Sequence, residues 1–284
     1  MSIASSAVLV ELNISVWTAN KLDKTATETV LRSNNATVSD AAQVRKNLMA
    51  GTTLRKSIAD YAAGCRLWHN TRTLPWSDKG PRLLPTSLFM DYKSEANVRR
   101  DTFLRMTDEF RDKYPALVQT AANYMGGLHD PADYPDVDEV MSKFGFRLVF
   151  SPVPTSNDFR LDIPQQELDE MAKSYDVAFE TRVAEAMRTP WDKLHDMLTG
   201  MTTKLTEGDD ETKRRWHDTF LTNAQDLCQM LTHLNITADP KLEAARRQLE
   251  SAILGADLDN IKEDAMTRAD LKDKLDTILK GYDW

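Results

Sequence analysis

The stretch from Gly127 to Pro164 constrains this chain most, because it predicts a β-hairpin between long helical patterns. It reads GLHDPADYPDVDEVMSKFGFRLVFSPVPTSNDFRLDIP, and large apolar residues occupy every second position over 146–150 and again over 159–163. Such alternation is typical of a strand with one buried face. We therefore expect a hairpin over residues 146–163, preceded by a short helix at 136–144.

A strand is also predicted near the beginning, where apolar residues occupy every second position from Val8 to Val16. With the hairpin it would form a small, mostly antiparallel sheet. Apolar residues at helical spacing predict helices at 18–33, 39–68 and 94–124. The proline-rich segment between the last two predicts a loop with at most a short strand at 87–90.

Helical spacing continues from Gln165 to nearly the last residue. It predicts a helix of about 24 residues, and Thr189-Pro190 indicates that a new helix or a sharp kink follows. Further apolar stripes run from Trp216 to Leu234, after Asp239-Pro240, and over 258–278. A helix with one apolar stripe must bury it, so we expect antiparallel helices packed as a bundle or coiled coil, within one chain or between copies in a homo-oligomer.

The predicted fold class is therefore α+β and predominantly helical, with long antiparallel helices and a small, mostly antiparallel sheet. The predicted domains are a mixed α+β part at 1–163 and a helical bundle at 164–284. The alternative is one continuous domain, which 284 residues also allow.

Cysteine content and the first residues narrow the expected location. The two cysteines, Cys65 and Cys228, form no CxxC pattern, so no disulfide framework or cysteine zinc site is predicted and a reducing cytoplasm fits. The first residues have no basic segment followed by an apolar run, so we expect neither a signal peptide nor a membrane span. We predict a cytoplasmic protein.

Charge is unevenly distributed along the chain. Residues 1–92 carry 11 basic and 7 acidic side chains, a net charge of +4, whereas the remainder carries 25 and 37, a net charge of −12. Such asymmetry indicates a binding partner without naming it.

The basic stretch from Arg45 to Arg82 contains aromatic residues among its cations, a composition that suits single-stranded nucleic acid. The candidate contact residues are Arg55, Lys56, Arg66, Trp68, Arg72 and Trp76. We favour the competing interpretation, a solvated helix face whose aromatics pack inward, because no known DNA- or RNA-binding motif accompanies the charge.

Three His-Asp pairs occur, at His129-Asp130, His195-Asp196 and His217-Asp218. A metal-dependent phosphohydrolase would use such a pair with further ligands from neighbouring helices. Adjacent His and Asp residues also arise by chance on helix surfaces, which we favour. No catalytic residue, metal ligand or cofactor is predicted.

The hairpin stretch and LPWSDKGPRLLPTSLFMDY at 74–92 resemble a family of proteins from tailed bacteriophages and prophages. The resemblance extends to TPWDKLHDM and LTHLNITADPKLEAARRQLE. It implies a protein of the host cytoplasm during infection, encoded near MoxR-type AAA+ ATPases and von Willebrand factor A-like proteins. The family has no established reaction, so the resemblance assigns no functional residue.

The sequence hypothesis is thus a non-catalytic phage protein that acts as an adaptor or scaffold, with an AAA+ ATPase of the MoxR type as its partner. A single-strand nucleic-acid binder is the alternative, and a His/Asp metal phosphohydrolase is the third. No membrane partner is expected. For Trp284, the last residue, we favour docking on its own fold over contact with a partner.

Overall fold

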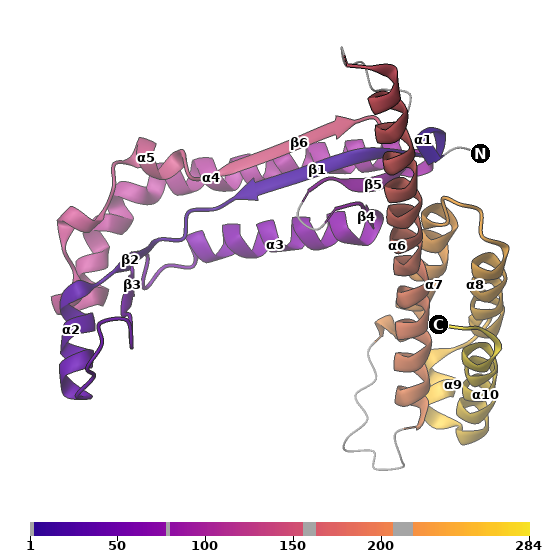
Figure 1. Cartoon of the computed structure of the whole chain (residues 1–284). Helices are drawn as coiled ribbons and strands as arrows, with labels where there is room; N and C mark the ends of the chain where they lie inside the picture. The colour runs from indigo at the N-terminus through magenta and orange to yellow at the C-terminus, as the bar shows by residue number, and fades with distance from the viewer. Residues whose placement is uncertain (1–2, 78–79, 156–162, 207–217) are drawn as a thin grey trace. The chain divides into compact units, whose positions relative to one another are not determined.

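A computed structural model describes residues 3–77, 80–155, 163–206 and 218–284 (Figure 1). The fold is predominantly helical α+β with a small antiparallel sheet, as the sequence predicts. The strands are β1 (Ala7–Ser15), β2 (Asn20–Leu22), β3 (Arg45–Asn47), β4 (Leu74–Pro75), β5 (Arg82–Pro85) and β6 (Gly145–Ser151). The α-helices are α1 (Ile3–Ser6), α2 (Lys24–Ser33), α3 (Leu54–Arg72), α4 (Phe89–Met125), α5 (Val137–Met141), α6 (Gln165–Thr206), α7 (Thr219–Leu234), α8 (Pro240–Ile253), α9 (Leu258–Glu263) and α10 (Ala265–Gly281). Three short 3₁₀ turns are η1 (Thr86–Leu88), η2 (Gly126–Leu128) and η3 (Pro131–Asp133).

The chain forms two compact units, and neither is continuous in sequence. Unit 1 comprises Met1–Glu11, Asn70–Tyr92 and Val149–Trp284, and unit 2 comprises Leu12–His69 and Lys93–Leu148. The sequence instead indicated one boundary, between residues 163 and 164, or one continuous domain. The boundaries differ because the first half of β1, β4 and β5 share a hydrophobic core with the later helices.

One sheet has the strand order β4-β5-β1-β6, and β2 and β3 form a separate antiparallel pair. β1 runs antiparallel to β5, with Ala7 opposite Pro85 and Val10 opposite Arg82. β5 runs antiparallel to β4, with Leu74 opposite Leu83. The strand predicted at residues 8–16 is confirmed as β1.

β6 confirms the first strand of the predicted hairpin, and its neighbour in the described sheet is β1. The second predicted strand, over 159–163, lies outside the described residues except for Ile163, which is in a bend. The short helix expected at 136–144 is α5, and Asp136 caps it by accepting from the Asp138 backbone N–H at 3.0 Å.

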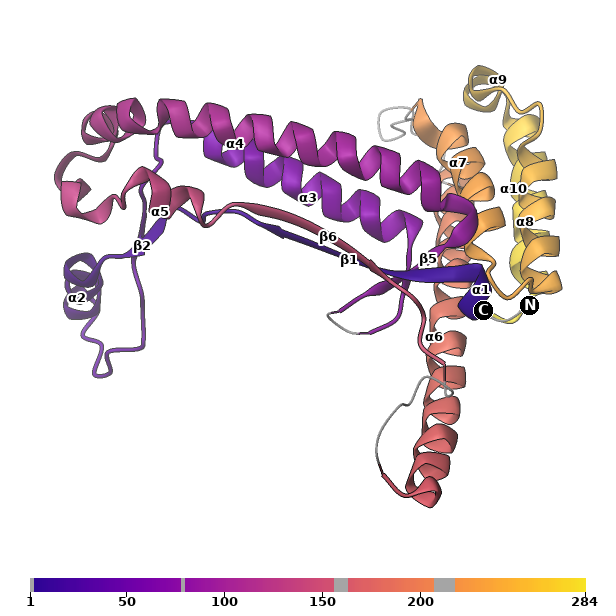
Figure 2. The ribbon, with the colours of Figure 1, turned by 90° about the horizontal axis from the view of Figure 1, so that it is seen from above.

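In unit 2, α3 and α4 run side by side, as both ribbon views show (Figures 1 and 2). Their facing side chains share one core, and the Tyr61 hydroxyl on α3 donates to the Arg99 carbonyl on α4 at 3.3 Å. The core is rich in aromatic rings, including Trp17, Phe103, Phe110, Tyr114, Phe144 and Phe146. Their edge-to-face and tilted contacts add to the stabilisation that comes from area burial.

The prediction of a helix from Ser39 to Trp68 is wrong for its first fifteen residues, because α3 begins at Leu54. Gly51 has a φ of +79°, a left-handed conformation that interrupts a right-handed helix. Residues 45–47 pair with β2 instead, so tertiary pairing decides their structure. Likewise, the helix expected at 18–33 begins only at Lys24, where Asp23 caps it.

The segment around residues 70–90 also departs from the sequence prediction. Its extended parts are β4 and β5, whereas residues 87–90, where a short strand was expected, form the end of η1 and the start of α4. α4 then confirms the helix predicted at 94–124 and contains Pro115.

In unit 1, α6, α7, α8 and α10 pack around a core that is mainly aliphatic (Figure 1). Buried members of this core include Leu194, Leu198, Leu231, Leu249 and Leu275. α6 continues through Pro190 to Thr206. Of the two alternatives predicted near Thr189, a new helix or a sharp kink, the new helix is therefore wrong.

The helix expected at 258–278 is divided at Asp264, which ends α9 and caps α10 by accepting from the Thr267 backbone N–H at 3.0 Å. The docking of Trp284 is confirmed. Its indole N–H donates to the Leu279 carbonyl at 2.7 Å, and its ring lies 5.5 Å from that of Trp191.

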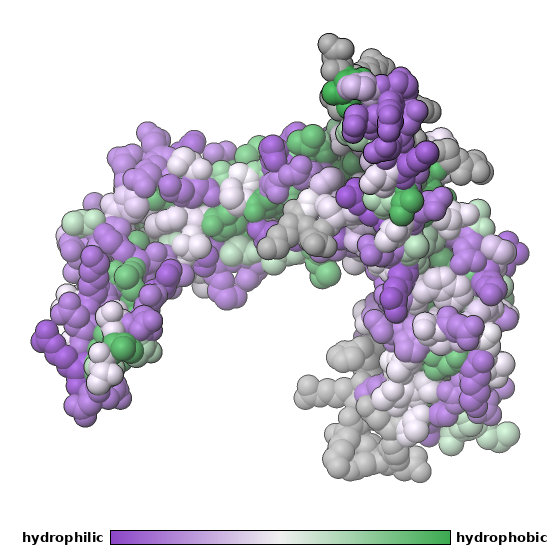
Figure 3. Space-filling view, in the orientation of Figure 1, coloured by the Kyte–Doolittle hydropathy of each residue, from purple (hydrophilic) through white to green (hydrophobic). Residues whose placement is uncertain are grey.

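No helix in the described part of the chain is both long and apolar enough to cross a membrane. The view coloured by hydropathy shows mainly hydrophilic side chains over α2 (Figure 3). This agrees with the absence of any buried residue on α2.

Candidate functional site

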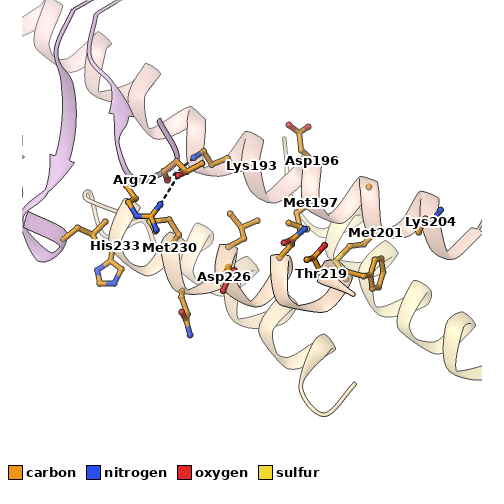
Figure 4. Close-up of a pocket in the computed structure, with 17 residues that line it drawn as sticks. Arg72, Lys193, Asp196, Met197, Met201, Lys204, Thr219, Asp226, Met230 and His233 are labelled. Atoms are coloured by element: carbon orange, nitrogen blue, oxygen red, sulfur yellow. Dashed lines mark hydrogen bonds between the residues drawn. The ribbon is translucent and has the colours of Figure 1, made fainter. Parts of the chain in front are cut away.

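A groove of about 1020 Å³ lies in unit 1 between α6 and α7 (Figure 4). Two residues at the end of α3, Thr71 and Arg72, and Leu88 of η1 also line it. It is large enough for several side chains of a ligand, since ligand pockets commonly measure about 300–1,000 Å³.

The spacing of residues along the two helices creates this groove. On α6, Lys193, Met197, Gly200 and Lys204 recur every three or four residues, so they share one face. The adjacent stripe of α6, with Leu194 and Leu198, is buried in the core. Each turn of α6 therefore contributes one side chain to the core and one to the groove.

α7 is divided in the same way. Ala224, Leu231 and Leu234, members of the apolar stripe that the sequence indicated, are buried. Phe220 and Leu227 of the same stripe line the groove and remain partly exposed, as does Met230. Trp216, the first member of the stripe, lies outside the described residues.

The floor of the groove is thus apolar and rich in methionine, with Met197, Met201 and Met230 beside Leu227 and Phe220. Methionine is unbranched and polarizable, so surfaces rich in it adapt to partners of different shape. The described structure leaves part of this floor open to solvent.

Cations gather at the end of the groove nearest to α3. Figure 4 places Arg72 and Lys193 together there, with Lys204 and Thr219 at the opposite end. The Lys193 ammonium donates to the Thr71 carbonyl at 3.3 Å. Arg82, on β5, donates through Nε to the Thr73 hydroxyl at 2.7 Å and through Nη2 to the Thr73 carbonyl at 3.0 Å.

Burial disfavours the charged forms of Lys193 and Arg82, and for Lys193 the charge of Arg82 adds to this effect. Burial lowers the pKa of Lys193, and the positive charge of Arg82 lowers it further. Burial also lowers the pKa of Arg82. Across residues 3–77, 80–155, 163–206 and 218–284, neither Arg82 nor Lys193 forms an ion pair with a carboxylate.

Acidic and neutral polar groups occupy other parts of the lining. Asp226 lies between the two ends in Figure 4, and Asp196 is also a lining residue. His233 lies near the cationic end, where its Nδ1 is 3.0 Å from the Ser87 hydroxyl. The groove therefore combines an apolar floor, a cationic end and carboxylates along its length.

The candidate nucleic-acid residues have separate structural roles. In unit 2, Arg55 donates to the Trp17 carbonyl at 2.9 Å, and Arg66 donates to the Ile14 carbonyl at 2.7 Å. Both arginines thereby attach α3 to the chain at and just after β1. Lys56 forms an exposed ion pair with Asp60 at 2.8 Å.

The two tryptophans of that set are buried. Trp68 is 6% exposed, and the Arg99 guanidinium lies over its ring, with Arg99 Cζ 4.8 Å from the Trp68 ring centroid. Trp76 is 7% exposed and makes an edge-to-face contact with Phe179 at 5.3 Å. Neither ring presents a free face for base stacking, on which sequence-tolerant single-strand binding depends. Arg72 belongs to the α6–α7 groove.

The His-Asp pairs show no convergence within the described residues. The ring of His195 lies 5.1 Å from that of Trp284, and the ring of His129 lies 5.3 Å from that of Tyr134. His217 lies outside the described residues. In the described part of the chain, no group of three or more His, Cys, Asp or Glu side chains could hold a metal ion.

Sequence reasoning did not identify the groove, although one signal was present. The core stripe of α6 contains Leu194, Leu198 and Met201, whereas the neighbouring face has Met197 between Lys193 and Lys204. An apolar residue between cations, outside the core stripe, is compatible with a face that packs against something outside the main core.

Comparisons with models of known protein families, with curated proteins and with solved structures gave no match. The geometry of this chain is therefore the basis for assigning it a function.

Proposed function

We propose that this protein is a non-catalytic adaptor that binds an amphipathic helix of a partner protein in the groove between α6 and α7. The observation that carries the proposal is the row of partly exposed apolar side chains, Phe220, Leu227 and Met230 on α7 and Met197 on α6. An apolar groove between helices is a recurrent binding site for the apolar face of another helix.

The length of the groove supports a helical ligand. Its lining extends along α6 from Lys193 to Lys204 and along α7 from Thr219 to His233. At 1.5 Å per residue these stretches measure roughly 16 and 21 Å. A docked helix of three to four turns, about 11 to 14 residues, would cover them.

The family resemblance supplies a specific partner for this proposal, an AAA+ ATPase of the MoxR type. The test is a binding measurement between the purified chain and a MoxR-type AAA+ ATPase, with and without nucleotide. Met230→Glu would place a charge on the floor of the groove, and we expect it to weaken binding by at least about tenfold because a buried unpaired charge costs several kcal/mol.

Met266→Glu is the matched control, because Met266 lies on α10 and is 81% exposed. The control should bind like the unmodified protein. If the unmodified protein does not bind the ATPase, that partner is wrong. If Met230→Glu binds as well as Met266→Glu, the groove is not the docking site.

A further inference from the structure

We propose that the cationic end of the groove is an anion-binding subsite that takes a carboxylate near one end of the docked helix. This inference rests on the proposed function, because it assigns chemistry to the ligand of the same groove. Its basis is that Lys193 and Arg72 line this end of the groove together. Arg82 is bound to Thr73, two residues from the Thr71 carbonyl that accepts from Lys193, and no described carboxylate pairs with Lys193 or Arg82.

The cations of this subsite are held in place by neutral acceptors. Thr71 and Thr73 accept hydrogen bonds from Lys193 and Arg82 through carbonyl and hydroxyl oxygens, which orient the cations without neutralising them. Like charges kept close together and partly out of water raise the free energy of the unbound protein. An incoming carboxylate would remove that cost, so binding is favoured by charge pairing and by relief of repulsion.

The rest of the groove determines which anion fits. The subsite continues into the floor formed by Met230, Leu227 and Met197, so a complete ligand has an apolar body as well as an anionic group. Asp226 lies further along the same groove and would repel a second anionic group. This pattern disfavours a nucleic acid and favours a peptide helix with apolar residues along one face and an Asp or Glu near one end.

The experiment is a selection of 14-residue helical peptides by the full-length protein. The library places Leu or Met along one face and varies all other positions among Glu, Gln, Lys and Ala. We expect the selected peptides to carry Glu near one end and to lose binding to Met230→Glu. For a selected peptide, Glu→Gln should weaken binding to the unmodified protein by about tenfold or more, as expected when one partner of a partly buried charge pair is removed.

A double-mutant cycle identifies the cation involved. Lys193→Met should remove most of the difference between the Glu and Gln forms of the peptide. Lys204→Met is the matched control, because Lys204 lies on the same face of α6 at the opposite end of the groove, and it should leave the difference unchanged.

The outcomes separate this inference from the proposed function. If peptides bind in the groove but the Glu and Gln forms bind equally well, the anion subsite is wrong and the helix-binding groove stands. If no selected peptide is sensitive to Met230→Glu, both are wrong. If inorganic phosphate alone saturates a Lys193-dependent site while no peptide prefers Glu, the carboxylate assignment is overturned.

Discussion

Lys46 in unit 2 and Lys193 in unit 1 are both partly withdrawn from water, and they differ in what lies beside them. The side chain of Lys46 is 10% exposed and pairs with Asp133, which is 7% exposed and also pairs with Lys21 at 2.7 Å. The hydrogen bond to Asp133 raises the pKa of Lys46, whereas burial and Arg82 lower the pKa of Lys193. The first arrangement stabilises the folded chain, and the second is suited to an anion from outside.

A third cation shows that this difference is local to the groove. Arg246, also in unit 1, is 8% exposed at its side chain and is bound by Glu243 and Glu250. Unit 1 therefore contains a buried cation, Arg246, that is paired with carboxylates. The lack of an ion pair between a described carboxylate and Lys193 or Arg82 is a property of that site and not of the unit's composition.

The largest effect is expected for Asp133→Asn. It removes the negative charge that pairs with Lys46. Among the described residues, the buried ammonium then keeps the neutral side chain at 133, the Leu128 carbonyl at 3.1 Å and the more distant carboxylate of Asp23 at 3.8 Å. Loss of one partner of a buried ion pair costs about 3–5 kcal/mol. Urea unfolding followed by circular dichroism measures it, and a loss below about 1 kcal/mol would show that this pair is not structural.

Glu243→Gln should have the next largest effect, about 2 kcal/mol at pH 7, because charge-assisted hydrogen bonds contribute roughly 1.5–3 kcal/mol. Glu243 accepts from Arg246 Nε at 2.8 Å and from Arg247 Nε at 2.6 Å. These bonds, first those to Arg246, lower the pKa of Glu243 from 4.5 to about 2.

The pH dependence of that effect follows from the direction of the shift. A carboxylate whose pKa is lower in the folded chain contributes stability that is present above pH 4.5 and is lost as the pH falls toward about 2. The gap in urea midpoint between the unmodified protein and Glu243→Gln should therefore close over this range. Glu180→Gln, on an exposed part of α6, controls for removal of a surface charge. A constant gap would contradict the assignment.

Lys193→Met should change the free energy of unfolding in the opposite direction. It removes repulsion with Arg82, and we expect it to raise the free energy of unfolding by about 1 kcal/mol, within the range common for single stabilising substitutions. Because the pKa of Lys193 is lowered below 10.5 in the folded chain, the gain should be complete at neutral pH and should vanish as the pH rises to 10.5. A destabilised variant at neutral pH would show that Lys193 is a structural residue.

The smallest effect is expected for Lys56→Gln, which breaks an exposed pair with Asp60. The two side chains are 73% and 64% exposed, so the loss should be about 0.3 kcal/mol. Urea unfolding measured beside Asp133→Asn tests whether burial accounts for the contrast between the two pairs. A loss above about 1 kcal/mol would contradict that explanation.

Much of the fold followed from local sequence patterns. Apolar residues at every second position predicted β1 and β6, and the caps at Asp136 and Asp239 predicted the starts of α5 and α8. These features were predictable because they depend on residues a few positions apart. The helix expected across residues 39–53 failed because pairing between β2 and β3, which are distant along the chain, overrides local spacing.

The candidate site was much less predictable. The sequence marked Arg72 for its charge and placed Phe220 and Leu227 on an apolar seam, but it did not connect them. The connection depends on which edge of α6 and of α7 the core leaves uncovered, and on β5 carrying Arg82 to the vicinity of Lys193. Helical periodicity identifies a stripe without identifying its neighbour.

The sequence by itself determined that this chain would be a predominantly helical α+β protein with a small sheet, because apolar periodicity and turn residues act over short distances. The tertiary structure alone decided which cations are paired. Arg55, Arg66 and Lys46 became structural through contacts with distant carbonyls and carboxylates, whereas Lys193 and Arg82 were brought together without a described carboxylate. The physical reason is that the free energy of a buried charge depends on its neighbours in space, and folding brings those neighbours from distant parts of the chain.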